Sequence, residues 1–564
     1  MSTTDWLVMV STIVMIVAYG IWKSIGSKNI EDFLLADKEL PWYQVGFSVM
    51  ATQASAITFL SVPGQAYTDG LRFVQFYFGL PLAMIVLCVT FIPIFRDLNV
   101  YTAYEYLEKR FDNKTRLLTA FLFLLQRGLS TGLTIYAPAI ILSVILHIEI
   151  FYTTIFMGSI VILYTAYGGT KAVSYTQMLQ MCIMFAGLFL AAYMVFSLLP
   201  PEVGFSDALH IAGEMDRLNA IDFSFDINNR YNIWSGIIGG FFLHLSYFGT
   251  DQSQVGRYLT AKSTTESRFG LIMNGLLKIP MQFMILFIGT LVFVFYQFNT
   301  PPVFFNELEE GRLRKSTYHE EYSKLEKDYN HSQEQKREHL QTLLQSMDQK
   351  DKAAVDKAGT ELKKVEKESQ QIRNKVIGLI KKNDPEADTN DGNYIFLSFV
   401  TKQLPVGVIG LLIAMILLAS MGAVASGLNS LASTTIIDFY KRLWVKDASE
   451  QTYLNASRWA TIGWGIFCIL AALYASKMGN LIEAVNILGS LFYGTILGIF
   501  LVAFYLKKVE GSAVFYSAII TESFVVYAWL TELMTFLWLN VVGCLLVILI
   551  ALVLQKVLNL DSQD

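Results

Sequence analysis

Charged residues, cysteines and histidines are scarce in this chain. Only 16% of its 564 residues are charged, against roughly 25% in an ordinary soluble protein. Its four cysteines fall in apolar stretches without metal-ligand spacing, so we expect packing residues, not a zinc site or a disulfide framework. The apolar stretches show no Ser/His/Asp set, paired carboxylates or metal cluster, so enzymatic activity is not expected. A nucleic-acid partner is not expected either.

Apolar stretches are abundant instead. Hydrophobic residues make up 54% of the chain, and the mean hydropathy is +0.44. A membrane helix needs about 20 apolar residues, and about thirteen stretches reach that length. The sequence therefore predicts an all-α polytopic protein of the cell (inner) membrane, embedded in a lipid bilayer. The predicted spans centre near residues 15, 57, 86, 130, 158, 187, 243, 286, 418, 468, 493, 522 and 545. The first is expected to be a retained helix, because no positive charge precedes it and no cleavage site follows it.

Basic residues in the short loops predict the orientation. They follow spans three, seven, nine and eleven, as at Arg110, Lys262, Lys441 and Lys507. Such loops stay in the cytoplasm, so we expect the N-terminus outside and the C-terminus inside.

Residues 303–392 carry about two-fifths of all Lys and Arg, yet the span count places them outside. Long loops cross membranes largely regardless of charge. Interleaved opposite charges, with Leu340, Leu343 and Leu344 at helical spacing, predict an extracytoplasmic helical hairpin. This hairpin is either a solvated extension or a docking surface for an envelope partner.

Two spans contain polar residues at membrane depth. Trp42 to Gly70 carries Thr52-Gln53-Ala54-Ser55 at its middle, and span seven carries Gly239, Gly240, His244 and Tyr247. Interrupted helices are the usual location of transporter binding sites, although polar side chains also join helices by hydrogen bonds.

Four motifs carry a resemblance to a known family. They are Gly249-Thr-Asp-Gln-Ser-Gln-Val-Gly-Arg-Tyr258, Tyr164-Thr-Ala-Tyr-Gly-Gly169, Tyr106-Leu-Glu-Lys-Arg-Phe111, and Leu428-Asn-Ser430 followed by Asp438-Phe-Tyr-Lys441. In this order they resemble the sodium:solute symporter family (sodium/glucose cotransporter-like). The resemblance implies a LeuT-type core of two inverted five-helix repeats, spans two to six and seven to eleven, with Na+ as coupling ion and no other cofactor.

The resemblance also implies positions for the sodium site. Carbonyl ligands fall on Ala51, Ala54 and Ala419, hydroxyl ligands on Gly422 and Ala423, and a nearby carboxylate on Gln177. Neither Gly422 nor Ala423 has a side-chain oxygen, and Gln177 is neutral. Ser420, Ser426 or Thr52 would have to complete the cage if sodium binds there.

The resemblance also implies positions that contact the solute. The resemblance places an inner-gate aromatic at Tyr247 and solute contacts at Thr58, Tyr77 and His244, beside Gln53 and Thr52 in the interrupted span. A hydrogen-bonded structural histidine is the alternative interpretation of His244.

Arg127 lies deep in span four, where a charge costs at least about 2.5 kcal/mol. Our hypothesis is that it substitutes for the sodium charge, with Gln126, Gln53 or Gln177 as its partner; a snorkelling arginine is the alternative.

Three functions are compatible with these sequence features. The first is sodium-coupled symport of a small organic solute by alternating access. The second is sodium-independent transport by the same fold. The third is a non-transporting sensor or scaffold, which is disfavoured because no signalling domain is recognised after Leu560.

The expected organisation of the chain is 1–40 (extra helix and cytoplasmic loop), 41–199 (first repeat), 200–302 (outer loop, spans seven and eight), 303–392 (hairpin), 393–508 (spans nine to eleven) and 509–564 (spans twelve and thirteen).

Overall fold

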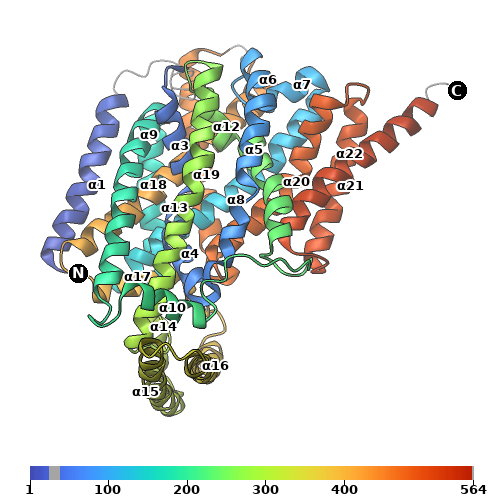
Figure 1. The fold of residues 1–564 in the computed structure, drawn as a ribbon. Helices are drawn as coiled ribbons and strands as arrows, with labels where there is room; N and C mark the ends of the chain where they lie inside the picture. Colours follow the sequence, from blue (N-terminus) through green and yellow to red (C-terminus); the bar gives the residue numbers. More distant parts are fainter. Residues whose placement is uncertain (25–37, 99, 447, 562–564) are drawn as a thin grey trace.

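A computed structural model describes residues 1–24, 38–98, 100–446 and 448–561 (Figure 1). These residues form helices and no β-strand, with one isolated bridge between Leu40 and Ala261, so the predicted all-α class is confirmed. Nine helices in the described ranges are long and apolar enough to cross a membrane. The count of about thirteen spans stays a prediction, because several expected spans are interrupted or joined.

The first helix, α1 (Thr3–Ser24), lies at one edge of the bundle and packs against α9 (Ile150–Ser197) and α18 (Val408–Thr434) (Figure 1). Asp5 fixes its start, because its carboxylate accepts hydrogen bonds from Gly407 N (2.6 Å) and Gly410 N (3.3 Å) at the beginning of α18. Most of the cytoplasmic loop predicted to end near residue 40 lies outside the described residues.

The second predicted span is interrupted where its polar residues lie. Helix α3 (Trp42–Gln53) ends before Ala54 (φ −84°, ψ 83°), and α4 (Ala56–Asp69) begins after Ser55 (φ −93°, ψ 176°). Gly70 then turns the chain at φ +71°, where a Cβ would lie 2.6 Å from the carbonyl oxygen of Arg217. The third span follows in pieces: η2 (Gly70–Tyr77), α5 (Leu80–Val86), η3 (Leu87–Phe91) and α6 (Ile92–Asp97).

Helices α7 (Glu105–Arg110) and α8 (Asn113–Leu146) come next, and Asp112 caps α8 by accepting from Thr115 N at 2.7 Å. Helix α9 joins two apolar segments that the sequence predicts as separate spans. Tyr164 Oη lies 3.0 Å from Thr176 Oγ1, although twelve residues of straight helix rise about 18 Å. The chain therefore bends sharply between these two residues.

Span seven is the second interrupted helix. After α10 (Phe205–Glu214), it runs through η4 (Ser235–Gly239), α11 (Gly240–Thr250) and α12 (Gln252–Leu259). The chain leaves helical geometry at Asp251 (φ −80°, ψ 117°), which separates α11 from α12. The glycines near 239 instead allow close packing: a Cβ on Gly240 would lie 2.7 Å from Phe76 O.

The charged segment forms the predicted hairpin. After α13 (Thr264–Phe298) and α14 (Glu307–Arg314), helices α15 (His319–Asp348) and α16 (Lys352–Asn383) pack side by side and project from one end of the bundle (Figure 1). An ion pair between buried Lys336 and half-buried Glu366 (2.7 Å) joins the two helices, and Arg373–Asp391 (2.8 Å) anchors α16 to the chain beyond it. The start of α1 lies at this same end (Figure 1).

The remaining elements complete the bundle. They are α17 (Gly392–Gln403), α18, η5 (Thr435–Trp444), α19 (Glu450–Ala472), η6 (Ala475–Met478), α20 (Leu481–Tyr505), α21 (Gly511–Leu530) and α22 (Phe536–Asp561). At the end opposite the hairpin, buried Arg116 ties α8 to Asp438 of η5 (2.6 Å) and to Glu108 of α7 (2.5 Å). Helices α21 and α22 lie at the edge away from α1 (Figure 1).

Candidate functional site

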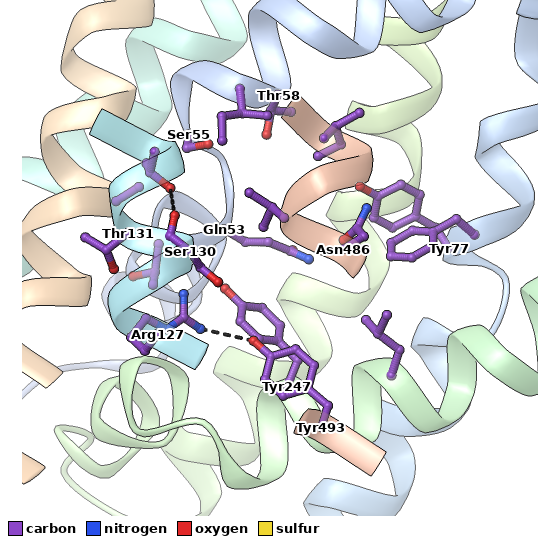
Figure 2. A pocket seen from close by; sticks show the side chains of 18 residues that line it. Gln53, Ser55, Thr58, Tyr77, Arg127, Ser130, Thr131, Tyr247, Asn486 and Tyr493 are labelled. Carbon is purple, nitrogen blue, oxygen red and sulfur yellow. Dashed lines mark hydrogen bonds between the residues drawn. The ribbon is translucent and has the colours of Figure 1, made fainter. Parts of the chain in front are cut away.

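A central cavity of about 80 Å³ lies beside the break between α3 and α4 (Figure 2). Helices α8, α11, α18 and α20 and the η2 segment complete its wall. The lining combines hydroxyls, amides and aromatic rings with a single charged side chain: Thr52, Gln53, Ser55, Ile57, Thr58, Phe76, Tyr77, Arg127, Ser130, Thr131, Thr134, Leu243, Tyr247, Ala423, Ile482, Val485, Asn486 and Tyr493. Both interrupted helices thus contribute to one site.

Three lining side chains have buried polar atoms without a hydrogen-bond partner. They are Gln53 Oε1, Asn486 Nδ2 and Arg127 Nε. Figure 2 shows Gln53 of α3, Asn486 of α20 and Arg127 of α8 around the same space. Buried polar groups in proteins are nearly always paired, so these atoms mark a place where a polar ligand would bind.

Arg127 is paired with Asp251, the residue at which span seven breaks. The Asp251 side chain is fully buried and also accepts from Ser253 N (2.8 Å), Ser253 Oγ (2.7 Å) and Tyr493 Oη (3.0 Å). Asp251 therefore caps α12 and links it to α8 and α20. The guanidinium also lies over the Tyr247 ring, 5.5 Å from its centre.

This pairing corrects the partner expected for Arg127. Gln126 bonds instead to Ser130 (2.8 Å) and Tyr493 (3.2 Å), and Gln177 bonds to groups on α3 and α18. Asp251 is the one carboxylate between residues 227 and 265, and this isolation is the signal in the sequence that could have identified it as the partner. Because the carboxylate balances the guanidinium, Arg127 does not present the free positive charge that the sequence hypothesis requires.

The predicted solute positions divide into two groups. Gln53, Thr52, Thr58, Tyr77 and Tyr247 all line the cavity. His244 lies behind the wall: it is fully buried, its Nε2 is 3.2 Å from Phe76 O, and its ring stacks on Tyr77 at 5.7 Å. This burial and the contact with Phe76 O agree with the interpretation of His244 as a structural residue. Tyr493 and Asn486 also line the cavity but are not predicted from the sequence, because both are uncharged and the one charge of α20, Glu483, lies in its first turn and not in the cavity lining.

The positions assigned to sodium lie where α3 faces α18. Ala51, Ala54, Ala419 and Gly422 are buried, and Ala423 is half-buried at the cavity wall. Thr52 Oγ1 bridges the two helices by a 3.0 Å hydrogen bond with Ser426 Oγ. A Cβ on Gly422 would lie 2.5 Å from Gln180 Oε1, so Gln180 occupies the space of the hydroxyl expected there.

Gln177 of α9 fills the gap between these helices. Its Oε1 accepts from Ser48 Oγ at 2.6 Å. Its Nε2 lies within hydrogen-bond distance of Ser426 Oγ (2.9 Å), Gly422 O (3.2 Å) and Thr52 Oγ1 (3.2 Å). The amide nitrogen thus takes up oxygen lone pairs that a cation at this place would need.

The similarity of this chain to known proteins identifies its family. The model of the sodium:solute symporter family matches residues 33–304 and 383–521, almost three-quarters of the chain. The chain belongs to the sodium:solute symporter family. The internal stretch without a match, residues 305–382, coincides with α14, α15 and α16, so the hairpin lies outside the part of the chain that the family model covers.

Curated relatives include the human sodium/iodide cotransporter, 31% identical over 52% of this chain and 45% of the relative. The chain thus spans less than half the length of that relative. The sodium/sialic acid symporter NanT of Aliivibrio fischeri is 25% identical over 100% of this chain and 95% of its own, and the sodium/glucose cotransporter of Vibrio parahaemolyticus is 26% identical over 93% and 85%.

A solved structure of a Na+-coupled sialic acid symporter, in a substrate-bound outward-open state, superposes with a TM-score of 0.76. It is 21% identical and covers 99% of this chain and 98% of its own. This likeness confirms the predicted LeuT-type fold.

Proposed function

We propose that this protein is a secondary active transporter of the cell membrane that couples sodium entry to the uptake of a small organic solute by alternating access. One observation carries the proposal: the break between α3 and α4 and the helix α11 of the second interrupted span line one cavity whose polar groups include unpartnered amides. Backbone breaks at membrane depth are tolerated where they line a binding site. Membership of a family of sodium:solute symporters supports the coupling.

The solute class that fits this cavity is a small organic anion. Arg127 is the charged side chain on the wall, and its Nε has no hydrogen-bond partner. Asp251 neutralises this guanidinium, so a solute carboxylate would be held by the N–H donors of Arg127 and by the hydroxyls and amides of the cavity, not by a free positive charge. Relatives named for iodide, monocarboxylates and sialic acid carry anions, which supports this choice.

Sodium-independent transport is the second candidate, and the amide of Gln177 favours it. A sodium ion between α3 and α18 would have to displace Nε2 from Ser426, Gly422 and Thr52. The pairing of Arg127 with Asp251 removes one support for this candidate, and it now rests on Gln177 together with the missing hydroxyls at Gly422 and Ala423. Docking of an envelope partner on the α15–α16 hairpin stays a prediction.

A stability screen tests the proposal. The purified protein is heated with a panel of small carboxylates and neutral sugars, in sodium chloride and in potassium chloride. A ligand at 100 times its dissociation constant adds about 2.7 kcal/mol, so a bound solute raises the melting temperature. We expect a carboxylate to stabilise the protein, and to do so more strongly in sodium. Gln53→Ala is the control, because it removes a cavity amide and should weaken the response.

Two outcomes would count against the proposal. Stabilisation by sugars alone would refute the anionic solute. An equal response in sodium and potassium would favour the second candidate.

A further inference from the structure

A second, smaller cavity lies on the α12 side of the break in span seven. Residues of helices α9, α12 and α18 line it, and its volume is about 20 Å³. That is room for one particle close to a water molecule in size. Its wall contains hydroxyls, amides and one arginine, Arg257, but no carboxylate.

Arg257 is buried without a counter-charge among the described residues. Only 3% of the residue is exposed, and its guanidinium donates to two neutral groups, Ser426 Oγ (2.7 Å) and Ser174 Oγ (3.3 Å). The nearest side chain of α9 on the other side of Ser426 is Gln177, which is neutral. Gln177 Nε2 and Arg257 Nη2 donate to the same Ser426 oxygen, so both groups around this serine are donors and neither meets a negative charge there.

Asn429 gives an independent sign of a missing ligand. It lines the same cavity and is 4% exposed, yet neither Nδ2 nor Oδ1 has a hydrogen-bond partner. A buried arginine without a counter-charge is costly, and an unpaired buried amide adds to that cost. Both costs fall if a small anion binds between them.

We propose that this cavity holds a monovalent anion of halide size, bound by Arg257 and the Asn429 amide nitrogen. Such an ion is close to water in size, carries the charge that Gln177 lacks, and accepts hydrogen bonds from the surrounding donors. The anion is structural or regulatory and distinct from the transported solute, which binds in the central cavity. The inference goes beyond the proposed function and holds whether or not sodium is the coupling ion.

Anion-dependent stability tests this assignment without any solute. The melting temperature of the purified protein is measured while gluconate is replaced by chloride or bromide, at constant sodium and ionic strength. We expect a rise that saturates with either halide and is absent with phosphate, which is too large. A response to phosphate and not to halides, or a rise that never saturates, would overturn the proposal.

Two variants locate the effect. Arg257→Gln should lose the halide response, whereas Arg230→Gln, whose side chain is 60% exposed, should keep it. If Arg257→Gln does not fold, Gln177→Glu decides, because its carboxylate replaces the anion. That variant should be more stable than the wild type in gluconate and insensitive to chloride. A Gln177→Glu protein with the wild-type halide response would refute the site.

In crystals soaked in bromide, we expect one anomalous peak between Arg257 and Asn429. A bromide peak elsewhere, with that cavity empty, would contradict the assignment directly.

Discussion

Removing one partner of the Arg127–Asp251 pair should destabilise the protein strongly. The Asp251 side chain is fully buried and that of Arg127 is 11% exposed, so Arg127→Gln leaves a carboxylate in the interior without its counter-charge. Breaking a buried pair in this way costs about 3–5 kcal/mol.

The surroundings of Asp251 place the expected cost at the lower end of that range, about 3 kcal/mol. Ser253 and Tyr493 still supply three donors to the carboxylate after Arg127 is replaced. The double variant Arg127→Gln/Asp251→Asn removes both charges. It should therefore lose less than the sum of the two single variants, with a coupling of about 0.5–3 kcal/mol.

Reversible unfolding in mixed detergent micelles, followed by circular dichroism, measures these free energies for the wild type and three variants. Single variants within about 0.5 kcal/mol of the wild type, with an additive double variant, would show that the pair does not form. Strong destabilisation with no coupling would show that each residue acts through other contacts.

Three further predictions concern the cavity, the topology and pH. Gln53→Ala should reduce solute uptake with little loss of folded protein, whereas Phe189→Ala, on an exposed outer face of α9, should transport normally; equal uptake by both would place the site elsewhere. A cysteine replacing Gln349, in the exposed hairpin turn, should react with an impermeant thiol reagent in intact cells once exposed Cys182 is changed to Ser; protection would invert the predicted orientation. Burial raises the pKa of Asp388, between α16 and α17, to about 7, so the folded protein holds a proton that the unfolded chain releases. Stability should therefore fall as pH rises from about 4 to 7, and Asp388→Asn should flatten that slope; an unchanged slope would refute the assignment.

Structural features that depend on the local residue types could be predicted from the sequence. The polar stretch at Thr52–Ser55 predicts a break, and α3 and α4 separate there. Interleaved charges over residues 303–392 predict a helical hairpin, and α15 and α16 form it. Both signals are local, because a backbone break needs polar neighbours and a solvated helix needs charges at helical spacing.

Long-range partners could not be predicted in the same way. Arg127 and Asp251 are 124 positions apart, and only the packing of α8 against the break in span seven brings them together. Gln177 was recognised as neutral, but its bonds to α3 and α18 depend on the sharp bend of α9. The assigned roles of the site residues, the domain boundaries and the orientation of the termini stay predictions.

Uptake into proteoliposomes tests sodium coupling most directly. A solute identified by the stability screen is supplied with an inward sodium gradient or an equal potassium gradient, at constant chloride. We predict accumulation above the external concentration only with sodium, and its collapse when the gradient is dissipated. Equal accumulation with potassium would contradict sodium-coupled symport.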